Sequence, residues 1–126
     1  MIDNFLYKDL SYKIIGIAME VHRELGPGFL EKVYENALMI LFKENNISAK
    51  QQENIKIKFR NKIIGDYIAD IIVEDLIILE LKSSKSINPI YKAQLGNYLK
   101  ATNKKVGIIL NFGKESLEVE RVVNSI

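Results

Sequence analysis

The sequence contains no cysteine and no long run of hydrophobic residues. The absence of cysteine excludes disulfide bonds and zinc sites built from thiolates. No hydrophobic run approaches the roughly 20 residues that a membrane-spanning helix needs. The first ten residues, MIDNFLYKDL, have an early acidic residue and no apolar core, so we expect no signal peptide. We therefore expect a cytoplasmic protein without a membrane partner.

The sequence also lacks an excess of one charge, with 18 basic and 16 acidic residues and a net charge of +2. That balance does not indicate a nucleic-acid-binding protein, but it permits one if the basic side chains gather on one face. Hydrophobic residues make up 48% and charged residues 27%, which is typical of a folded chain. The length suits one core and not two, so we predict a single domain over residues 1–126.

Three helices are predicted from the spacing of hydrophobic residues. Residues 10–25 and 30–43 both place such residues three and four positions apart, as amphipathic helices do. Gly26-Pro27-Gly28 ends the first of them, since a glycine can adopt the left-handed cap and proline cannot continue a helix. The third helix starts with Asn88 as its N-cap and Pro89 at its first position, and it runs to about residue 101.

Four or five strands are predicted in the remaining segments. Residues 55–59 alternate strictly between apolar and polar, and residues 63–73 read as the returning strand. Residues 76–79 are apolar on both faces, which suggests a central strand covered on both sides. Residues 105–110 form another apolar strand, and residues 117–123 a last strand or helix. The order α-α-β-β-β-α-β predicts an α/β or α+β fold, a mixed sheet flanked by helices.

Three charged residues interrupt these apolar strands. Asp70 lies within the second strand, and Glu80 and Lys82 close the third. Burial of an unpaired carboxylate is unfavourable, so such a group is kept where it is paired, metal-bound or at the open end of a sheet. Glu80 and Lys82 are two positions apart on a strand, so their side chains share a face.

The turn between the second and third strands decides whether Asp70 and Glu80 meet. A two-residue turn at positions 74–75 would pair Asp70 with Leu79 and direct Glu80 to the opposite face. A three-residue turn over positions 74–76 would pair Asp70 with Glu80. We predict the three-residue turn, or a bulge with the same effect.

Two carboxylates and a lysine around one cavity suit phosphodiester hydrolysis. Carboxylate oxygens are ligands for Mg²⁺ or Mn²⁺, which polarise a phosphoryl group and activate water. A lysine can then stabilise the developing charge or hold that water. The structural alternative is an ion pair between Lys82 and Glu80 or Asp70 at a strand end.

These residues and two further motifs resemble a known family. Asp70 with Glu80-Leu81-Lys82 resembles the signature of the PD-(D/E)XK nuclease superfamily, although Ala69 stands where the name has proline. The segment GFLEKVY at positions 28–34 matches G-x-x-E-x-x-Y, and its surroundings look like the small-protein family named for that motif. QLGNY at positions 94–98 is similar to the Q-x-x-x-Y motif of exonuclease-like members.

The resemblance implies a restriction-endonuclease-like core with the order α-β-β-β-α-β, and a role for each matching residue. Asp70 and Glu80 would bind Mg²⁺ or Mn²⁺, with the Leu81 carbonyl as a third ligand, and Lys82 would be the catalytic lysine. The remaining roles would fall to Glu31, which would reach the metal directly or through water, and to Gln94 and Tyr98, which would orient Lys82 or a phosphate.

Structural explanations stay open for several of these residues. Glu31 in the first turn of a helix also complements the helix dipole. Gln94 and Tyr98 also suit packing on the sheet. Basic side chains on the first predicted hairpin could line a phosphate backbone or form a solvated, protected edge: Lys56, Lys58, Arg60 and Lys62.

The sequence supports three hypotheses about function. The first is a Mg²⁺- or Mn²⁺-dependent nuclease, a hydrolase acting on DNA rather than RNA. The second is a non-catalytic module that binds nucleic acid or a protein partner on the same fold. The third is a nuclease subunit that acts as a homodimer or only with a protein partner. A basic side chain that forms a salt bridge in the cavity would favour the binding module. A metal bound at Asp70 and Glu80 would favour the enzyme.

Overall fold

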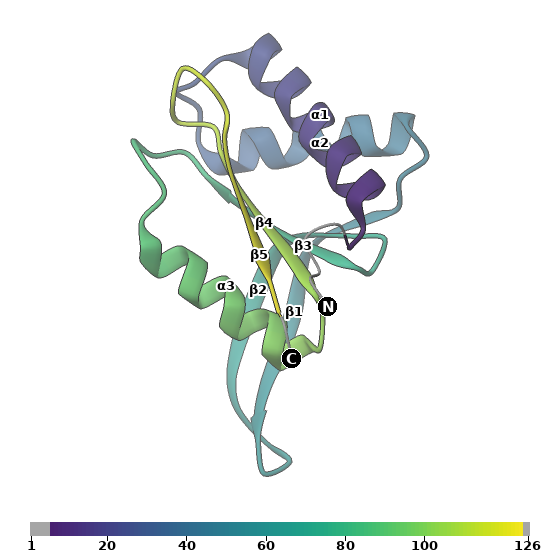
Figure 1. Cartoon of the computed structure of the whole chain (residues 1–126), viewed down its shortest axis with the longest axis vertical. Coiled ribbons are helices and arrows are strands. Elements are labelled where there is room, and N and C mark those ends of the chain that lie inside the picture. The colour runs from purple at the N-terminus through teal and green to yellow at the C-terminus, as the bar shows by residue number, and fades with distance from the viewer. Residues whose placement is uncertain (1–5, 125–126) are drawn as a thin grey trace.

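The first two helices pack against each other at one side of the molecule (Figure 1). The computed structural model describes residues 6–124. The first five of the ten residues in which we expect no signal peptide therefore lie outside the described residues. Helix α1 spans Lys8–Leu25 and helix α2 spans Glu31–Glu44. Between them Gly26 and Gly28 adopt φ angles of 73° and 111°, a region that favours glycine. The predicted glycine turn is therefore present.

Five strands form one mixed sheet in the order β1-β2-β3-β4-β5. The strands are β1 Ala49–Phe59, β2 Lys62–Val73, β3 Ile77–Lys82, β4 Val106–Asn111 and β5 Glu118–Val123. Only β3 and β4 are parallel, and helix α3, Pro89–Thr102, connects them. The Asn88 side chain accepts a hydrogen bond from the Ile90 N–H at 2.9 Å, so the predicted N-cap is confirmed.

The helices cover both faces of the sheet. One hydrophobic cluster joins α1 and α2 to side chains such as Ile71, Leu79 and Ile108, and a second joins α3 to Ile72, Ile78 and Ile109. Figure 1 shows α3 on the side of the sheet away from α1 and α2. Ile77, Ile78 and Leu79 are 0% exposed, which confirms the prediction of a central strand covered on both sides.

The predicted element order is confirmed, with two refinements. The last element is a strand, β5, which pairs antiparallel with β4. Strand β1 begins at Ala49 rather than near residue 55. Its first half, AKQQEN, is polar and shows no apolar alternation, so periodicity does not reveal it. No helix within residues 6–124 has the length and hydrophobicity needed to span a membrane.

The turn between β2 and β3 has the predicted length. Val73 pairs with Ile77, which leaves residues 74–76 as the turn, and the Leu76 N–H donates to the Val73 carbonyl at 2.9 Å. The pairs Ile72–Ile78 and Ile71–Leu79 follow. This register places Asp70 next to Glu80, as the three-residue turn predicts.

Candidate active site

Asp70 and Glu80 lie side by side where β2 and β3 stop pairing. The last recorded pair is Ile71–Leu79, and beyond it side chains bridge the two strands. Asp70 Oδ2 accepts the Leu81 N–H at 2.8 Å, and Glu80 Oε2 lies 3.4 Å from the Asp70 nitrogen. The two carboxylates therefore occupy the opening between the diverging strands, and each is fixed by the backbone of the other strand.

Tyr67 holds the Glu80 carboxylate from the other side. Its hydroxyl donates a hydrogen bond to Glu80 Oε2. Its ring stacks on Tyr98 of α3, with centroids 3.4 Å apart and planes 13° from parallel. Burial and the neighbouring Glu80 raise the pKa of Tyr67, so its hydroxyl stays protonated and remains a donor.

The environment of the two carboxylates disfavours negative charge. Burial raises the pKa of Asp70 above its ordinary value, although the Leu81 N–H partly opposes this. Burial, followed by the charge of Asp70, raises the pKa of Glu80 to about 7. Two desolvated carboxylates in contact require a nearby cation if both are to ionise. A hard divalent ion supplies that charge and prefers oxygen ligands, so this pair fits Mg²⁺ or Mn²⁺.

The Lys82 ammonium is near both carboxylates but forms no ion pair with them. Its Nζ lies 3.8 Å from the centroid of the Tyr91 ring, a cation–π contact. Lys82 lowers the pKa values of Asp70 and Glu80, so its charge acts on both. Among residues 6–124, the ion pairs involve other lysines. Neither the structural ion pair nor a basic side chain paired into the cavity is therefore present in the described chain.

Helix α3 supplies one wall of a small hollow over this site. Tyr91, Gln94, Leu95 and Tyr98 follow the spacing of one helix face, and they line the hollow together with Glu80 and Lys82. Gln94 and Tyr98 therefore lie beside Glu80 and Lys82. Tyr98 also packs on the sheet through Tyr67.

A model of the PD-(D/E)XK nuclease superfamily matches residues 8–122. The chain belongs to this superfamily. No curated protein has a matching sequence.

Two solved structures show the same fold as this superfamily member. The crystal structure of SSO0001 matches with a TM-score of 0.60 and 20% identity, covering 75% of this chain and 50% of SSO0001. The alkaline exonuclease LHK-Exo from Laribacter hongkongensis matches with a TM-score of 0.54 and 13% identity, covering 75% of this chain and 56% of the exonuclease. The chain spans about half the length of these proteins, and its core is restriction-endonuclease-like.

Helix α2 brings two glutamates to this nuclease-superfamily core, and they differ in burial. Glu31, in the first turn, is exposed, whereas Glu35 is 3% exposed. Both raise the pKa of Asp70, with Glu35 the stronger. The Glu35 carboxylate accepts hydrogen bonds from Lys32 at 3.1 Å, Gln51 at 2.6 Å and Gln52 at 2.9 Å. Glu31 has no comparable set of donors and is the freer carboxylate.

In the described chain, Asp70 and Glu80 are the two acidic side chains that could together hold an ion. Within residues 6–124, no group of three or more His, Asp or Glu side chains is close enough to share an ion. An ion between Asp70 and Glu80 would therefore be completed by water or by a backbone oxygen such as the Leu81 carbonyl. Mg²⁺ commonly keeps several waters and uses one or two carboxylates, so this donor set fits the ion.

A buried amide anchors the loop that follows β3. Asn111, 0% exposed, accepts hydrogen bonds from the Ser84 and Gly113 N–H groups and donates to the Ser84 carbonyl, each at 3.0 Å. The Ser83 hydroxyl donates to the Phe29 carbonyl at 2.7 Å. These contacts tie the end of β3 to β4 and to the α1–α2 turn, and so fix the backbone next to Lys82.

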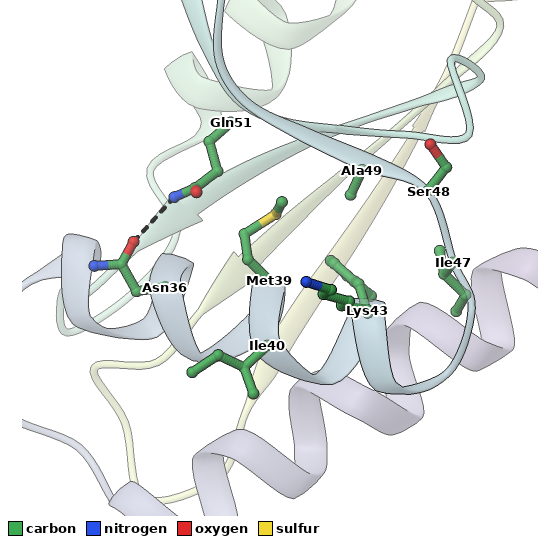
Figure 2. A pocket seen from close by; sticks show the side chains of 9 residues that line it. Asn36, Met39, Ile40, Lys43, Ile47, Ser48, Ala49 and Gln51 are labelled. Carbon is green, nitrogen blue, oxygen red and sulfur yellow. Dashed lines mark hydrogen bonds between the residues drawn. The ribbon is translucent and has the colours of Figure 1, made fainter.

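A larger hollow of about 560 Å³ lies away from the carboxylate pair, between α2 and the start of β1 (Figure 2). Its lining includes Met39, Ile40 and Ile47, and Gln51 donates a hydrogen bond to Asn36 at its edge. None of its lining residues carries a carboxylate or an imidazole, and its polar groups come from Asn36, Lys43, Ser48 and Gln51. Size alone therefore does not indicate the active site in this chain.

Three residues of the site were not predicted from the sequence: Tyr67, Tyr91 and Glu35. Tyr91 precedes Gln94 and Tyr98 by three and seven positions, so extending the helix spacing would have found it. Glu35 lies one turn after Glu31, among apolar residues. Tyr67 offered no such signal, because tyrosine is common in strands and its contact with Glu80 depends on the divergence of β2 and β3.

Proposed function

We propose that this chain is a Mg²⁺- or Mn²⁺-dependent nuclease that hydrolyses phosphodiester bonds, in DNA rather than RNA, and that it belongs with the small G-x-x-E-x-x-Y proteins. The observation that carries the proposal is the pair of half-buried carboxylates, Asp70 and Glu80, beside a lysine that pairs with neither. A purely structural site would pair these charges with one another.

The ion would be held by the Asp70 and Glu80 carboxylates, with the Leu81 carbonyl as a further ligand. When bound, a divalent ion polarises the phosphoryl group and lowers the pKa of an attacking water. Asp70 is already oriented by the Leu81 N–H, and Glu80 by the Tyr67 hydroxyl. The protein therefore holds both ligands in place before the ion arrives, which lowers the ordering cost of binding.

Lys82 would act on the substrate. Its ammonium rests on the Tyr91 ring and keeps its hydrogen-bond donors free of the carboxylates. It can donate to a phosphate oxygen or to the attacking water, and stabilise the charge that develops. Gln94 lines the same hollow and would contact a phosphate or Lys82, while Tyr98 would act through Tyr67. Glu31 would reach the ion through water.

The proposal is tested by incubating the purified protein with labelled single- and double-stranded DNA and RNA, in Mg²⁺, Mn²⁺ or chelator. Asp70→Asn is measured in parallel, with Asp75→Asn as the matched control, because Asp75 is an exposed acid in the turn after β2. We expect cleavage of DNA that disappears in chelator and in Asp70→Asn, and persists in Asp75→Asn.

Equal cleavage by wild type and Asp70→Asn would contradict the proposal. The absence of cleavage on every substrate would instead favour the non-catalytic module or a subunit that needs a homodimer or protein partner. A subunit that needs a partner is consistent with the length of the chain, which spans about half the length of the solved structures that it matches.

A further inference from the structure

The hairpin between β1 and β2 extends beyond the rest of the sheet. Strand β3 pairs with β2 only over Ile71–Val73, so the earlier part of β2 pairs with β1 alone. Ile55 and Tyr67 still pack against the α3 cluster. Beyond them, residues 56–66 form a projecting two-stranded ribbon, called the arm here, which Figure 1 shows reaching past α3.

The arm has a defined shape. Lys56 and Asp66 form a cross-strand ion pair at 2.8 Å, and Phe59 pairs with Lys62 across the tip. Arg60 and Asn61 form the two-residue turn, with φ angles of 52° and 66°. Arginine is uncommon at such an angle, where glycine or asparagine is less strained. The turn therefore presents a cation at the tip at some cost in stability.

The arm concentrates positive charge. It contains four of the 18 basic residues and one of the 16 acidic residues, so its net charge is +3 and that of the remaining residues is −1. Lys58, Arg60 and Lys62 are exposed and belong to none of the ion pairs in residues 6–124. Apolar side chains stand between them, with Phe59 59%, Ile63 58% and Ile64 65% exposed.

We infer that the arm binds the backbone of duplex DNA at a distance from the cleaved phosphate. This inference rests on the proposed function, and it adds a contact surface outside the active site. A two-stranded ribbon fits the major groove, its cations meet phosphates, and exposed apolar groups meet sugars and base edges. A second copy of the chain is a poorer occupant, because a symmetric contact between arms would bring two +3 charges together.

The arm is joined to the active site through β2. Tyr67, at the base of the arm, donates to Glu80, and Asp70 follows on the same strand. The tip is nine residues from Asp70, or about 30 Å at roughly 3.3 Å per residue. That distance is close to one turn of B-form DNA, about 34 Å. The tip therefore reaches phosphates about nine base pairs from the cleaved bond.

The test compares two triple variants of equal charge. In the arm variant Lys58→Gln, Arg60→Gln and Lys62→Gln are combined, and Lys56 is retained because it pairs with Asp66. The control variant combines Lys13→Gln, Arg23→Gln and Lys43→Gln, exposed residues on α1 and α2. Binding to a fluorescein-labelled 30-base-pair duplex is measured by anisotropy in chelator over a series of salt concentrations, after melting curves show that each variant is folded.

We expect the arm variant to bind roughly tenfold or more weakly, with the slope of log K against log salt smaller by about 3. The control variant should keep the wild-type slope. Equal binding by the two variants would overturn the inference, as would a change in self-association without a change in DNA binding. The readout is independent of cleavage: weaker binding by the arm variant supports the arm even if the wild type cleaves nothing, and unchanged binding overturns it even if the wild type is an active nuclease.

Discussion

At the scale of single residues, Glu80 reports most directly on the environment of the site. Its carboxylate is half-buried, lies next to Asp70 and accepts a hydrogen bond from the Tyr67 hydroxyl. Burial and the Asp70 charge together raise its pKa to about 7 from an ordinary value of 4.5. In the metal-free protein, folding therefore favours the protonated form of this residue.

Glu80→Gln should flatten the dependence of stability on pH. Between pH 4.5 and 7 the folded wild type retains a proton that the unfolded chain releases, so its stability falls as pH rises through this window. Glutamine does not titrate and removes that contribution. Melting temperatures of both proteins in chelator, from pH 4 to 8, provide the measurement. Parallel curves for wild type and Glu80→Gln would show that the pKa of Glu80 is not raised.

Some residues of the site could be predicted from the sequence, and others could not. Asp70, Glu80 and Lys82 could be predicted because each interrupts an apolar strand, where a charge is costly. Tyr67 could not, because an aromatic residue suits a strand and breaks no pattern. Glu35 was not predicted for another reason: its buried carboxylate accepts hydrogen bonds from Gln51 and Gln52, which lie in the polar half of β1 that periodicity did not reveal.

At the scale of elements, α2 presents two glutamates with separate physical settings. Glu35 is buried and accepts hydrogen bonds from three side chains, so it holds α2 to β1. Glu31 is exposed in the first turn, within electrostatic range of Asp70. Glu35 therefore contributes to stability, whereas the Glu31 carboxylate would be available to a bound ion.

Substitution of these two glutamates should separate stability from activity. In Glu35→Gln, the new amide donor faces the Lys32, Gln51 and Gln52 donors. The substitution should therefore lower the free energy of unfolding by about 1–3 kcal/mol. Glu31→Gln should leave that free energy within about 0.5 kcal/mol of wild type and slow metal-dependent cleavage about tenfold or more. Denaturant unfolding and cleavage rates measure the two effects. Full activity in Glu31→Gln would assign Glu31 to the helix dipole alone.

The loop after β4 packs against the residues that follow β3. A Cβ at Gly113 would lie 2.3 Å from the Ser84 nitrogen and 2.4 Å from the Ser84 oxygen, which are backbone atoms. Gly113→Ala should therefore displace residues 83–84, lower the free energy of unfolding by about 1–3 kcal/mol and slow cleavage by shifting Lys82. The effect depends on contact with the backbone of the neighbouring loop rather than on the conformation of the glycine.

Gly16→Ala is the matched control for this substitution. Gly16 lies within α1, with no atom near an added Cβ, so alanine should raise the free energy of unfolding by about 0.5–1 kcal/mol and leave cleavage unchanged. Urea unfolding and initial cleavage rates of both variants provide the test. A Gly113→Ala protein as stable and active as Gly16→Ala would contradict the packing described for the loop.

At the scale of the whole molecule, the element order and the site were predicted from different features of the sequence. Hydrophobic periodicity predicted three helices, the central strand and the mixed sheet, and the three-residue turn predicted the Asp70–Glu80 register. Periodicity could not predict the divergence of β2 and β3 beyond Ile71 and Leu79, because that depends on the twist of the sheet. The same divergence opens the site and frees the arm.

We propose that Asp70, Glu80 and Lys82 form a metal-dependent nuclease site, and substitution of Lys82 tests this proposal. Single-turnover cleavage of labelled DNA in Mn²⁺ would be measured for Lys82→Ala and for Lys85→Ala, an exposed lysine three residues further on. We predict that Lys82→Ala is slower by about a hundredfold or more at unchanged melting temperature, and that Lys85→Ala matches wild type. Equal rates for the two variants would contradict the account of the site.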